Sequence, residues 1–525
     1  MKKIIIIVVV LILLTCGGGI VGYLVQGGEQ AQGETNLRFT EIPTGFTHAM
    51  DLKKSLPFTG AAAIDIDGDG VDEIFSGGGN DQADGFFKYN GEALDAMGNL
   101  GVNKGAGVAT FGAASIDATK DGRADLFVAR EDGVFFYTNT GKGFTGKKVD
   151  FPLEKTSMPL SIALADINKD GAVDLYISNY IRNEYVEGET IFNKEYGAFS
   201  NMLLNNGDNT FTDITKASGL FQQHNTFLSV FVDLDNDSHS DLVIAHDTGR
   251  VHIYKNNGDN TFTEKDNPSV LGYPMGIAVS DINNDGLMDL YFSNIGITLP
   301  KAMVKGDIRA DQDFNLDYIL LENKGDFVFE DTAQKRNAAE YGFGWGVVSY
   351  DFNNDTRQDY LIAQNYARFP GVKFLELHPG NLLQQYKGGS FKPVEKVSGI
   401  ANQHFGITPV VSDFNQDGKP DVVLANINGP LRAFINEDQD DNHWLKVRLA
   451  DNPSSIGALV RLTTASGKVY RNQFYTSEGL CSDQTHELFF GLGEEEALRS
   501  LVVEYQDGRL ETLSDVKADR VVTFK

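Results

Sequence analysis

One nine-residue pattern that recurs seven times constrains this chain more than any other feature. The first copy is Asp65–Glu73 (DIDGDGVDE), and the others begin at Asp117, Asp166, Asp233, Asp281, Asp351 and Asp413. Each follows Asp-x-(Asp/Asn/Thr)-x-Asp-(Gly/Ser/Thr)-x-x-(Asp/Glu), at intervals of 48 to 70 residues. Because repeats in register share one physical cause, the copies predict a series of equivalent structural units.

The residue types at fixed positions indicate a calcium loop. Ca²⁺ takes about six to eight oxygen ligands, and side chains at positions 1, 3 and 5 converge on one ion if the backbone coils tightly. Position 6 must then turn sharply, position 7 offers its carbonyl oxygen, and position 9 completes the shell. The ligands predicted in this way are Asp65, Asp67, Asp69, Val71 and Glu73; Asp117, Thr119, Asp121, Arg123 and Asp125; Asp166, Asn168, Asp170, Ala172 and Asp174; Asp233, Asp235, Asp237, His239 and Asp241; Asp281, Asn283, Asp285, Leu287 and Asp289; Asp351, Asn353, Asp355, Arg357 and Asp359; and Asp413, Asn415, Asp417, Lys419 and Asp421. We expect up to seven structural Ca²⁺ ions.

The loops differ in composition, which predicts that they bind Ca²⁺ with different affinities. Position 6 is Gly in five loops but Ser238 in the fourth and Thr356 in the sixth, where the turn is strained. The second loop has the neutral, short Thr119 at position 3. We expect loops two and six to bind Ca²⁺ most weakly, since each has only three carboxylates and also an unfavourable residue, Thr119 in loop two and Thr356 in loop six.

The flanking residues are wrong for an EF-hand. That motif needs a bidentate Glu at position 12 and helices on both sides, whereas here position 12 is never acidic. Short β-rich runs such as 277–279 and 290–292 flank the loops, so each loop is expected to join two strands of a hairpin. A single Asp-rich turn could equally be a solvated surface loop.

A second hairpin follows each loop. The strings 203–211 (LLNNGDNTF) and 254–262 (YKNNGDNTF) are nearly identical, and Asn-Gly is typical of hairpin turns. Two hairpins per repeat give four strands, which is one blade of a β-propeller.

These strings, with Phe111-Gly112-Ala113 and Phe405-Gly406 upstream of their loops, resemble FG-GAP and VCBS repeats over residues 36–437. The resemblance implies an all-β fold with a seven-bladed propeller like that of integrin α-subunits. Residues 36–42 look like the last strand of a repeat, and the final repeat ends without one. We therefore expect 36–42 to complete the seventh blade and remove an open sheet edge.

The pattern changes at residue 442. Alternating runs at 443–449 and 501–505 indicate strands. Residues 442–525 resemble the ASPIC/UnbV domain, which accompanies such repeats in cartilage-acidic-protein-like proteins. The resemblance implies a small β-sandwich-like domain and no established catalytic residue. Tyr505-Gln506, where the family usually has Trp-Pro, and Cys481 depart from its pattern.

The N-terminus predicts export. Lys2 and Lys3 precede an apolar run at 4–25 that is long enough to span a bilayer. Residues 1–25 are expected to be a signal anchor. A lipoprotein signal with Cys16 lipidated and a released protein are the alternatives. Residues 26–35 would be a flexible tether, and the protein would be membrane-anchored and extracytoplasmic, in a periplasm or at a cell surface.

Net charge and cysteine content exclude two further kinds of protein. The net charge of −28 argues against nucleic acid as a partner, because phosphate backbones need clustered Lys and Arg. The two cysteines give no disulfide framework.

A ligand face is expected opposite the calcium loops. The thirteenth residue after each loop's first Asp is polar in six of the seven repeats, and long insertions at 181–200, 296–318 and 366–381 leave on the same side. Long loops on a rigid scaffold usually bind something. The candidate ligand-binding residues are Arg130, Asn179, Tyr180, Arg182, His246, Asn294, Gln364, Tyr366, Arg368 and Asn426. The alternative is that these side chains cap strand ends and pack loops.

Catalytic motifs are missing from the sequence. It contains no Gly-x-Ser-x-Gly elbow, no phosphate-binding Gly loop with Lys, and no paired histidine spacing typical of metal sites. A binding or scaffolding role toward a protein or matrix ligand is favoured over an enzyme. A carbohydrate-binding propeller is the alternative, and a hydrolase built from propeller loops is less favoured.

Overall fold

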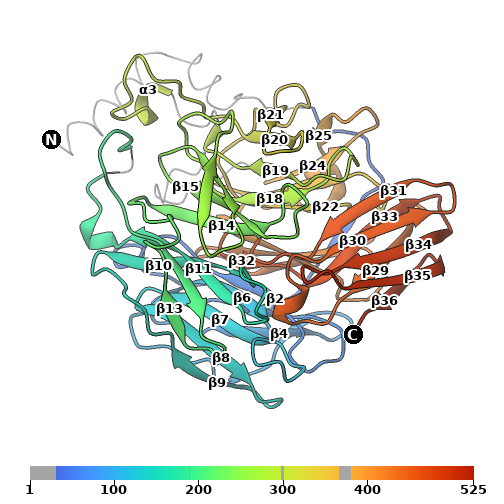
Figure 1. Cartoon of the computed structure of the whole chain (residues 1–525), viewed down its shortest axis with the longest axis horizontal. Coiled ribbons are helices and arrows are strands. Elements are labelled where there is room, and N and C mark those ends of the chain that lie inside the picture. Colours follow the sequence, from blue (N-terminus) through green and yellow to red (C-terminus); the bar gives the residue numbers. More distant parts are fainter. Residues whose placement is uncertain (1–30, 189, 297–300, 366–379) are drawn as a thin grey trace.

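The computed structural model describes residues 31–188, 190–296, 301–365 and 380–525. These residues form an all-β structure whose helical segments are short turns at Asn183–Tyr185 (η1), Lys301–Val304 (α3), Glu395–Ser398 (α4) and Pro453–Ser455 (η4). Figure 1 shows how the sheets surround a common centre, with the C-terminal domain on one side. Within the described ranges there are seven repeat sheets, each containing four antiparallel strands, and two further sheets in the C-terminal domain.

Six repeat sheets take their four strands in chain order. They are β2 (Ala61–Ile64), β3 (Glu73–Ser76), β4 (Gly85–Tyr89) and β5 (Leu94–Ala96); β6 (Thr110–Ile116), β7 (Asp125–Arg130), β8 (Gly133–Asn139) and β9 (Phe144–Lys148); β10 (Ser157–Ala165), β11 (Asp174–Ile181), β12 (Asn201–Asn205) and β13 (Phe211–Asp213); β14 (Thr226–Val232), β15 (Asp241–His246), β16 (Val251–Asn256) and β17 (Phe262–Lys265); β18 (Ile277–Ser280), β19 (Asp289–Phe292), β20 (Ile319–Asn323) and β21 (Phe329–Asp331); and β22 (Gly344–Tyr350), β23 (Asp359–Gln364), β24 (Asn381–Gln385) and β25 (Phe391–Pro393).

The seventh repeat sheet joins the two ends of the repeat region. It contains β26 (Gly406–Ser412), β27 (Asp421–Asn426) and β28 (Arg432–Asn436), and its fourth strand is β1 (Phe39–Ile42). β1 pairs with β28 from Phe39 opposite Asn436 to Ile42 opposite Ala433. The first strand of each sheet contacts the first strand of the next, and β26 contacts β2, so the sheets close into a ring.

Each of the seven Asp-rich loops, the candidate metal loops, joins the first and second strands of a repeat sheet. In β10 and β11, for example, Ala165 pairs with Asp174, so the loop that begins at Asp166 is the hairpin connection. The second hairpin lies where the Asn-Gly strings predict it, with Asn205 opposite Phe211. The predicted strand–loop–strand setting of the metal loops is confirmed.

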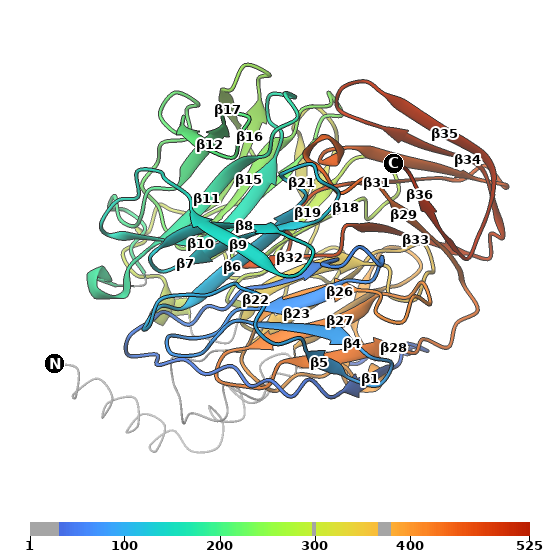
Figure 2. The ribbon, with the colours of Figure 1, turned by 90° about the horizontal axis from the view of Figure 1, so that it is seen from below.

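The C-terminal domain consists of two sheets. One contains β29 (His443–Arg448), β33 (Glu487–Gly493) and β36 (Arg520–Thr523); the other contains β30 (Leu459–Thr464), β31 (Val469–Gln473), β34 (Ala497–Glu504) and β35 (Leu510–Lys517). In Figure 2 these sheets, in red, lie against the ring of repeat sheets. Their buried residues, such as Leu445 and Val460, belong to one apolar cluster with Ile167 and Val173 of the third repeat. The domain therefore shares a core with the repeats.

A segment of this domain, residues 473–486, enters the centre of the ring; we call it the central loop. It contains the short strand β32 (Ser482–Asp483), which pairs in parallel with Ala61 and Ala62 of β2. Gly479 forms isolated bridges with Ile277 of β18 and Val347 of β22.

The central loop offers hydrogen-bond acceptors to all seven repeat sheets. The first strand of each sheet has an inner edge that no strand of a repeat covers, and the buried N–H groups on this edge need acceptors. The donors are Ala61 to Cys481 O, Ser115 to Asp483, Leu164 to Thr476, Asp233 to Gln473, Val279 and Ser349 to Glu478, and Val411 to Gln484. The central loop thus satisfies the inner edges of the ring.

The predicted membrane segment, residues 1–25, lies outside the described residues. Among those that are described, no helix has the length and apolar character needed to cross a membrane. The end of the predicted tether is ordered against the sixth repeat: Gly33 N donates to Pro393 O at 2.8 Å, and the Gln32 amide donates to Glu395 at 2.7 Å. The expectation of a flexible tether is therefore wrong for residues 32–34.

Candidate metal loops and ligand face

The first Asp of each loop organises the turn by accepting backbone hydrogen bonds. Asp166 accepts from Asp170 N at 3.0 Å and from Gly171 N at 2.7 Å, and the same pair of bonds recurs at Asp281 and Asp413. The coil requires positive φ at position 6. Ser238 (φ 67°) and Thr356 (φ 77°) adopt it despite their side chains, in agreement with the strain predicted there.

Position 4 is also left-handed in every loop, a feature that sequence reasoning missed. Its residues have φ between 54° and 74° and are Gly68, Lys120, Lys169, Asn236, Asn284, Asn354 and Gln416. Only the three Asn residues and Gly68 are types that favour this conformation, so the signal in the sequence is weak.

The acidic residue at position 9 connects the loop to the third strand. Asp174 accepts from Ile167 N at 3.0 Å and from Asn205 N at 2.8 Å, and Asp289 accepts from Ile282 N and Asn323 N in the same way. Burial raises the pKa of Asp174 and that of Asp289 to about 8. A buried carboxylate of this kind is stabilised in its charged form by a nearby cation.

The loops fit a hard cation such as Ca²⁺. Oxygen atoms of Asp65, Asp67 and Glu73 lie within 4.8 Å of one another, and so do those of Asp233, Asp235 and Asp237. Buried Oδ1 atoms of Asp235 and Asn353, both at position 3, find no hydrogen-bond donor in the described part of the chain. Clustered carboxylate and amide oxygens with free lone pairs are the ligands that Ca²⁺ prefers.

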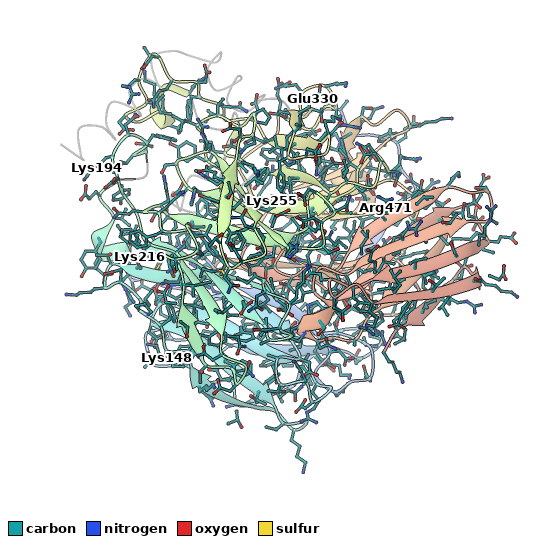
Figure 3. All side chains as sticks on the ribbon, in the orientation of Figure 1. Lys148, Lys194, Lys216, Lys255, Glu330 and Arg471 are labelled. Atoms are coloured by element: carbon teal, nitrogen blue, oxygen red, sulfur yellow. The ribbon has the colours of Figure 1, made fainter. Side chains whose placement is uncertain are left out.

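Basic side chains already reach several of the loops. Lys88 on β4 lies 2.6 to 2.8 Å from carboxylate oxygens of Asp67, Asp69 and Glu73 in loop one. Lys255 on β16, labelled in Figure 3, pairs with Asp235 and with Asp237 in loop four. The two loops with four carboxylates therefore carry a lysine from the third strand.

Loops two, six and seven also contact basic side chains. Arg123 and Arg357, at position 7, pair with the position-5 carboxylates of loops two and six. In loop seven, the buried Lys446 of the C-terminal domain lies 2.7 Å from Asp413. In loops three and five, by contrast, no ion pair to a ligand carboxylate is found among the described residues. In these two loops no basic side chain of the described chain takes the position that a metal ion would occupy.

An Asn or Gln at the start of the second hairpin links five of the seven loops to the next repeat. Its side-chain amide donates to the position-2 carbonyl of the preceding loop. The pairs are Asn139 with Ile66, Asn256 with Ile167, Asn323 with Leu234, Gln385 with Ile282, and Asn436 with Phe352, at 2.7 to 3.1 Å. In the third repeat Asn209 bonds Ala118 instead. In the fourth repeat this residue, Asn256, is the first Asn of the Asn-Asn-Gly string, which we interpreted only as a turn signal.

The C-terminal domain contacts the metal-loop face. Arg448 donates to Gly70 O of loop one at 2.7 Å, and Arg471, labelled in Figure 3, donates to Gly286 O of loop five at 3.2 Å. Trp444 packs against Gly418 of loop seven so closely that a Cβ there would lie 1.9 Å from its ring. Loop two donates from Asp117 N to Asp451 O of the domain. Loop four accepts from the Gln506 amide at Ser240 Oγ, and loop six accepts from the Asn442 amide at Asn353 O. The domain therefore covers much of this face.

The predicted polar ring on the opposite face is buried. Arg130, Asn179, His246, Asn294, Gln364 and Asn426 are all at most 3% exposed. Arg130 pairs with the buried Asp84 at 2.8 Å, Asn294 donates to Asp317 O, and Gln364 donates to Tyr318 Oη. The expectation of a ring that surrounds an open mouth is wrong, because these groups satisfy strand ends and neighbouring loops inside the fold.

Aromatic side chains fill the centre on this side. The Phe58 ring lies 5.7 to 6.1 Å from those of Phe111, Tyr180, Phe227 and Trp345. The Tyr180 hydroxyl bonds Asp247, whose pKa burial raises to about 7. Tyr180 is thus a packing residue, which corrects its assignment as a ligand anchor.

Arg182 occupies a different setting. It is half-buried and lines a groove of about 660 Å³ with Tyr185, Phe151, Lys148 and Lys155. The groove lies between the ends of β8 and β9 and the segment that follows β11. Tyr366 and Arg368, the remaining predicted anchors, lie outside the described residues.

Comparisons with known proteins agree with the repeats and the last domain. Residues 117–177 and 233–292 match the FG-GAP-like repeat, and residues 448–525 match the family described as ASPIC and UnbV. Cartilage acidic protein 1 of Xenopus tropicalis is 24% identical over 471 residues, which are 87% of this chain and 62% of that protein. The human protein is 22% identical over 490 residues, or 86% and 69%. The chain thus spans about 62% of the Xenopus relative's length.

Solved structures resemble the chain more distantly. A lectin of Agrocybe aegerita that recognises terminal N-acetylglucosamine has a TM-score of 0.38 and 18% identity, over 75% of this chain and 93% of its own. The BP39L lectin of Burkholderia pseudomallei has a TM-score of 0.42 and 12% identity, over 72% and 96%. Structural similarity at this level gives no information about the function of the chain.

Proposed function

Since the chain carries FG-GAP-like repeats followed by an ASPIC and UnbV domain, we propose that it is a seven-bladed β-propeller that holds structural Ca²⁺ and binds an extracytoplasmic protein or matrix ligand. The N-terminal segment would hold it at the membrane. Calcium would stabilise the loops and would not contact the ligand. One sheet of the ring corresponds to one blade.

The observation that carries the proposal is the difference between the two faces of the ring. The metal-loop face is in contact with the C-terminal domain, through Arg448, Lys446 and Arg471 among others. The opposite face carries the groove around Arg182 and Tyr185. Arg and Tyr are the residue types that most often dominate protein interfaces, so this groove is the proposed ligand site.

A binding panel tests the proposal. The full chain in excess Ca²⁺ is applied to immobilised matrix proteins and, in parallel, to a glycan array. We expect a matrix protein to be bound and its affinity to fall at least about tenfold in an Arg182→Ala/Tyr185→Ala variant, as for an interface anchor. Arg509→Ala, which alters an exposed arginine of the C-terminal domain, is the control.

Two outcomes contradict the proposal. Binding only to glycans, lost in the same double variant, would favour the carbohydrate-binding alternative. Ligand binding that is unchanged in the double variant but lost in Arg509→Ala would place the site on the C-terminal domain.

A further inference from the structure

Two lysines reach candidate metal loops from the third strand of the same repeat. Lys88 lies in β4 and Lys255 lies in β16, and each is the last residue but one of its strand. Both strands are labelled in Figure 2. The two lysines therefore occupy equivalent places in the first and fourth repeats.

The Lys88 ammonium lies among the ligand oxygens of loop one. Its Nζ is 2.6 Å from Asp67 Oδ2, 2.8 Å from Asp69 Oδ2 and 2.8 Å from Glu73 Oε1. An ammonium has three N–H groups, so three carboxylates match its donors. A Ca²⁺ ion would lie about 2.3 to 2.6 Å from the same oxygens. The ammonium therefore occupies nearly the position that an ion bound to positions 3, 5 and 9 would take.

Loop four repeats this arrangement with two of its carboxylates. The Lys255 ammonium, labelled in Figure 3, pairs with Asp235 at position 3 and lies 2.7 Å from Asp237 Oδ2 at position 5. It also lies 5.4 Å from the ring centre of Phe327 in the next repeat, a contact that attracts a cation. In both loops one ammonium thus bridges the carboxylates at positions 3 and 5.

The other basic side chains at the loops make a smaller contact. Among the ion pairs of the described residues, Arg123, Arg357 and Lys446 each meet a single ligand carboxylate, in loops two, six and seven. Position 3 of these loops is Thr or Asn, which has no charge to pair. The bridging arrangement is therefore confined, in the described chain, to loops one and four.

The sequence couples the lysine to an additional carboxylate. Position 3 is Asp only in loops one and four, as Asp67 and Asp235. The last residue but one of the third strand is Lys only in the same two repeats. In the other five it is Thr138, Leu204, Glu322, Gln384 and Ile435. Because the two features occur together twice and are both absent from the other repeats, we interpret the additional Asp as the partner of the ammonium.

We propose that Lys88 and Lys255 are built-in cations that take the place of Ca²⁺ in loops one and four. The inference rests on the proposed function, in which other loops bind Ca²⁺. A divalent ion in either loop would have to displace the ammonium or lie beside it, and two cations so close repel each other. Loops one and four would thus keep their charge balance when the Ca²⁺ concentration falls, whereas loops three and five would not.

The Ca²⁺ stoichiometry of the full chain tests the proposal. Metal-free protein is equilibrated with excess Ca²⁺, and bound ions are counted by titration calorimetry and by elemental analysis after free ions are removed. Lys88→Met and Lys255→Met should each bind one more Ca²⁺ per chain than the wild type, because Met keeps an apolar stem and removes the charge. In chelator both variants should melt at a lower temperature than the wild type, and excess Ca²⁺ should restore the melting temperature.

Lys147→Met is the matched control. It removes the same charge from an exposed position of β9, where Lys147 lies over the Phe136 ring and has no ion pair to a loop carboxylate among the described residues. Its Ca²⁺ stoichiometry should equal that of the wild type. If Lys88→Met fails to fold because its four carboxylates repel one another, Lys88→Met/Asp67→Asn leaves loop one with three carboxylates, as in loops three and five, and should gain the same ion.

The possible failures are distinguishable. Equal Ca²⁺ stoichiometry in the wild type, Lys88→Met and Lys255→Met overturns the proposal. A wild-type chain that binds an ion at every loop also overturns it, but leaves the proposed function intact. A wild type that binds no Ca²⁺, with variants that each gain one ion, supports the lysine assignment and contradicts the structural Ca²⁺ of the proposed function.

Discussion

Replacing Glu478 with Gln should make the protein more stable at neutral and alkaline pH. Glu478 lies in the central loop, where one carboxylate oxygen accepts from Ser349 N at 2.8 Å and from Val279 N at 3.3 Å. The other oxygen lies 3.2 Å from Tyr475 Oη. Gln can keep all three contacts, since its Oε1 accepts from both N–H groups and its amide can donate to Tyr475.

The magnitude follows from the pKa of the carboxyl group. Burial raises the pKa of Glu478 to about 8 from an ordinary value of 4.5, against the effect of its hydrogen bonds. The folded protein therefore keeps a proton that the unfolded chain releases above pH 4.5. This stabilisation is complete below pH 4.5 and is lost as pH rises toward 8, at about 1.4 kcal/mol per pH unit. Gln has no titratable group, so the Glu478→Gln variant does not lose this stability as the pH rises.

Urea unfolding in excess Ca²⁺ measures the difference. The free energy of unfolding of Glu478→Gln minus that of the wild type should grow by roughly 3 kcal/mol between about pH 5.5 and 7.5. The calcium-loop carboxylates titrate equally in both proteins and cancel. Glu504→Gln, at an exposed position of the same domain, should show no such growth. A difference for Glu478→Gln that stays constant with pH would mean that Glu478 is ionised in the fold, and the reasoning fails.

Four further predictions concern the loops and the ring. Removing Ca²⁺ with a chelator should lower the melting temperature, because even one site at 100 times its Kd contributes about 2.7 kcal/mol; an unchanged melt of metal-free protein refutes this. Asp170→Ala should weaken Ca²⁺ binding, measured by titration calorimetry, more than Asp121→Ala does, since Asp121 pairs with an arginine; the reverse order counts against the ranking. Asn256→Ala should cost about 1 to 3 kcal/mol in urea unfolding, whereas the exposed Asn257→Ala should cost little; equal costs argue against an inter-repeat role. A chain that ends at residue 441 should bind a hydrophobic dye and lose cooperative unfolding, because the inner strand edges lose their acceptors; a cooperative melt would show that the repeats fold alone.

Much of the repeat architecture could be predicted because it is local. The distance from Asp166 to Asp174 along the chain, and the β-rich residues on both sides, are enough to specify a hairpin with an acidic connecting loop. The pairing of β1 with β28 was also accessible, since a missing strand at one end and a surplus strand at the other have to meet.

The burial of the polar positions could not be predicted, because their partners follow no regular pattern. Arg130 pairs with Asp84, which belongs to the preceding repeat, while Gln364 bonds Tyr318 from the preceding insertion. A polar residue at a strand end looks the same in sequence whether it faces solvent or a buried partner.

The central loop was missed for a related reason. Its Thr476, Glu478, Asp483 and Gln484 read as an ordinary polar surface segment, with no periodicity to indicate burial. They are buried because the ring presents unpaired N–H groups in its interior, which is a property of the closed ring and of no single repeat.

The central loop has a consequence for how such a protein can evolve. Open repeat arrays gain and lose units by duplication and deletion, because each unit contacts only its neighbours. Here the segment from Gln473 to Gln484 offers acceptors to all seven first strands, and one oxygen of Glu478 serves two of them. A duplicated repeat would add an inner edge with no acceptor, and a deleted one would leave a polar group such as Asp483 or Glu478 buried without its donor. The copy number and the last domain are therefore expected to be inherited together, and a change in one without the other should be selected against.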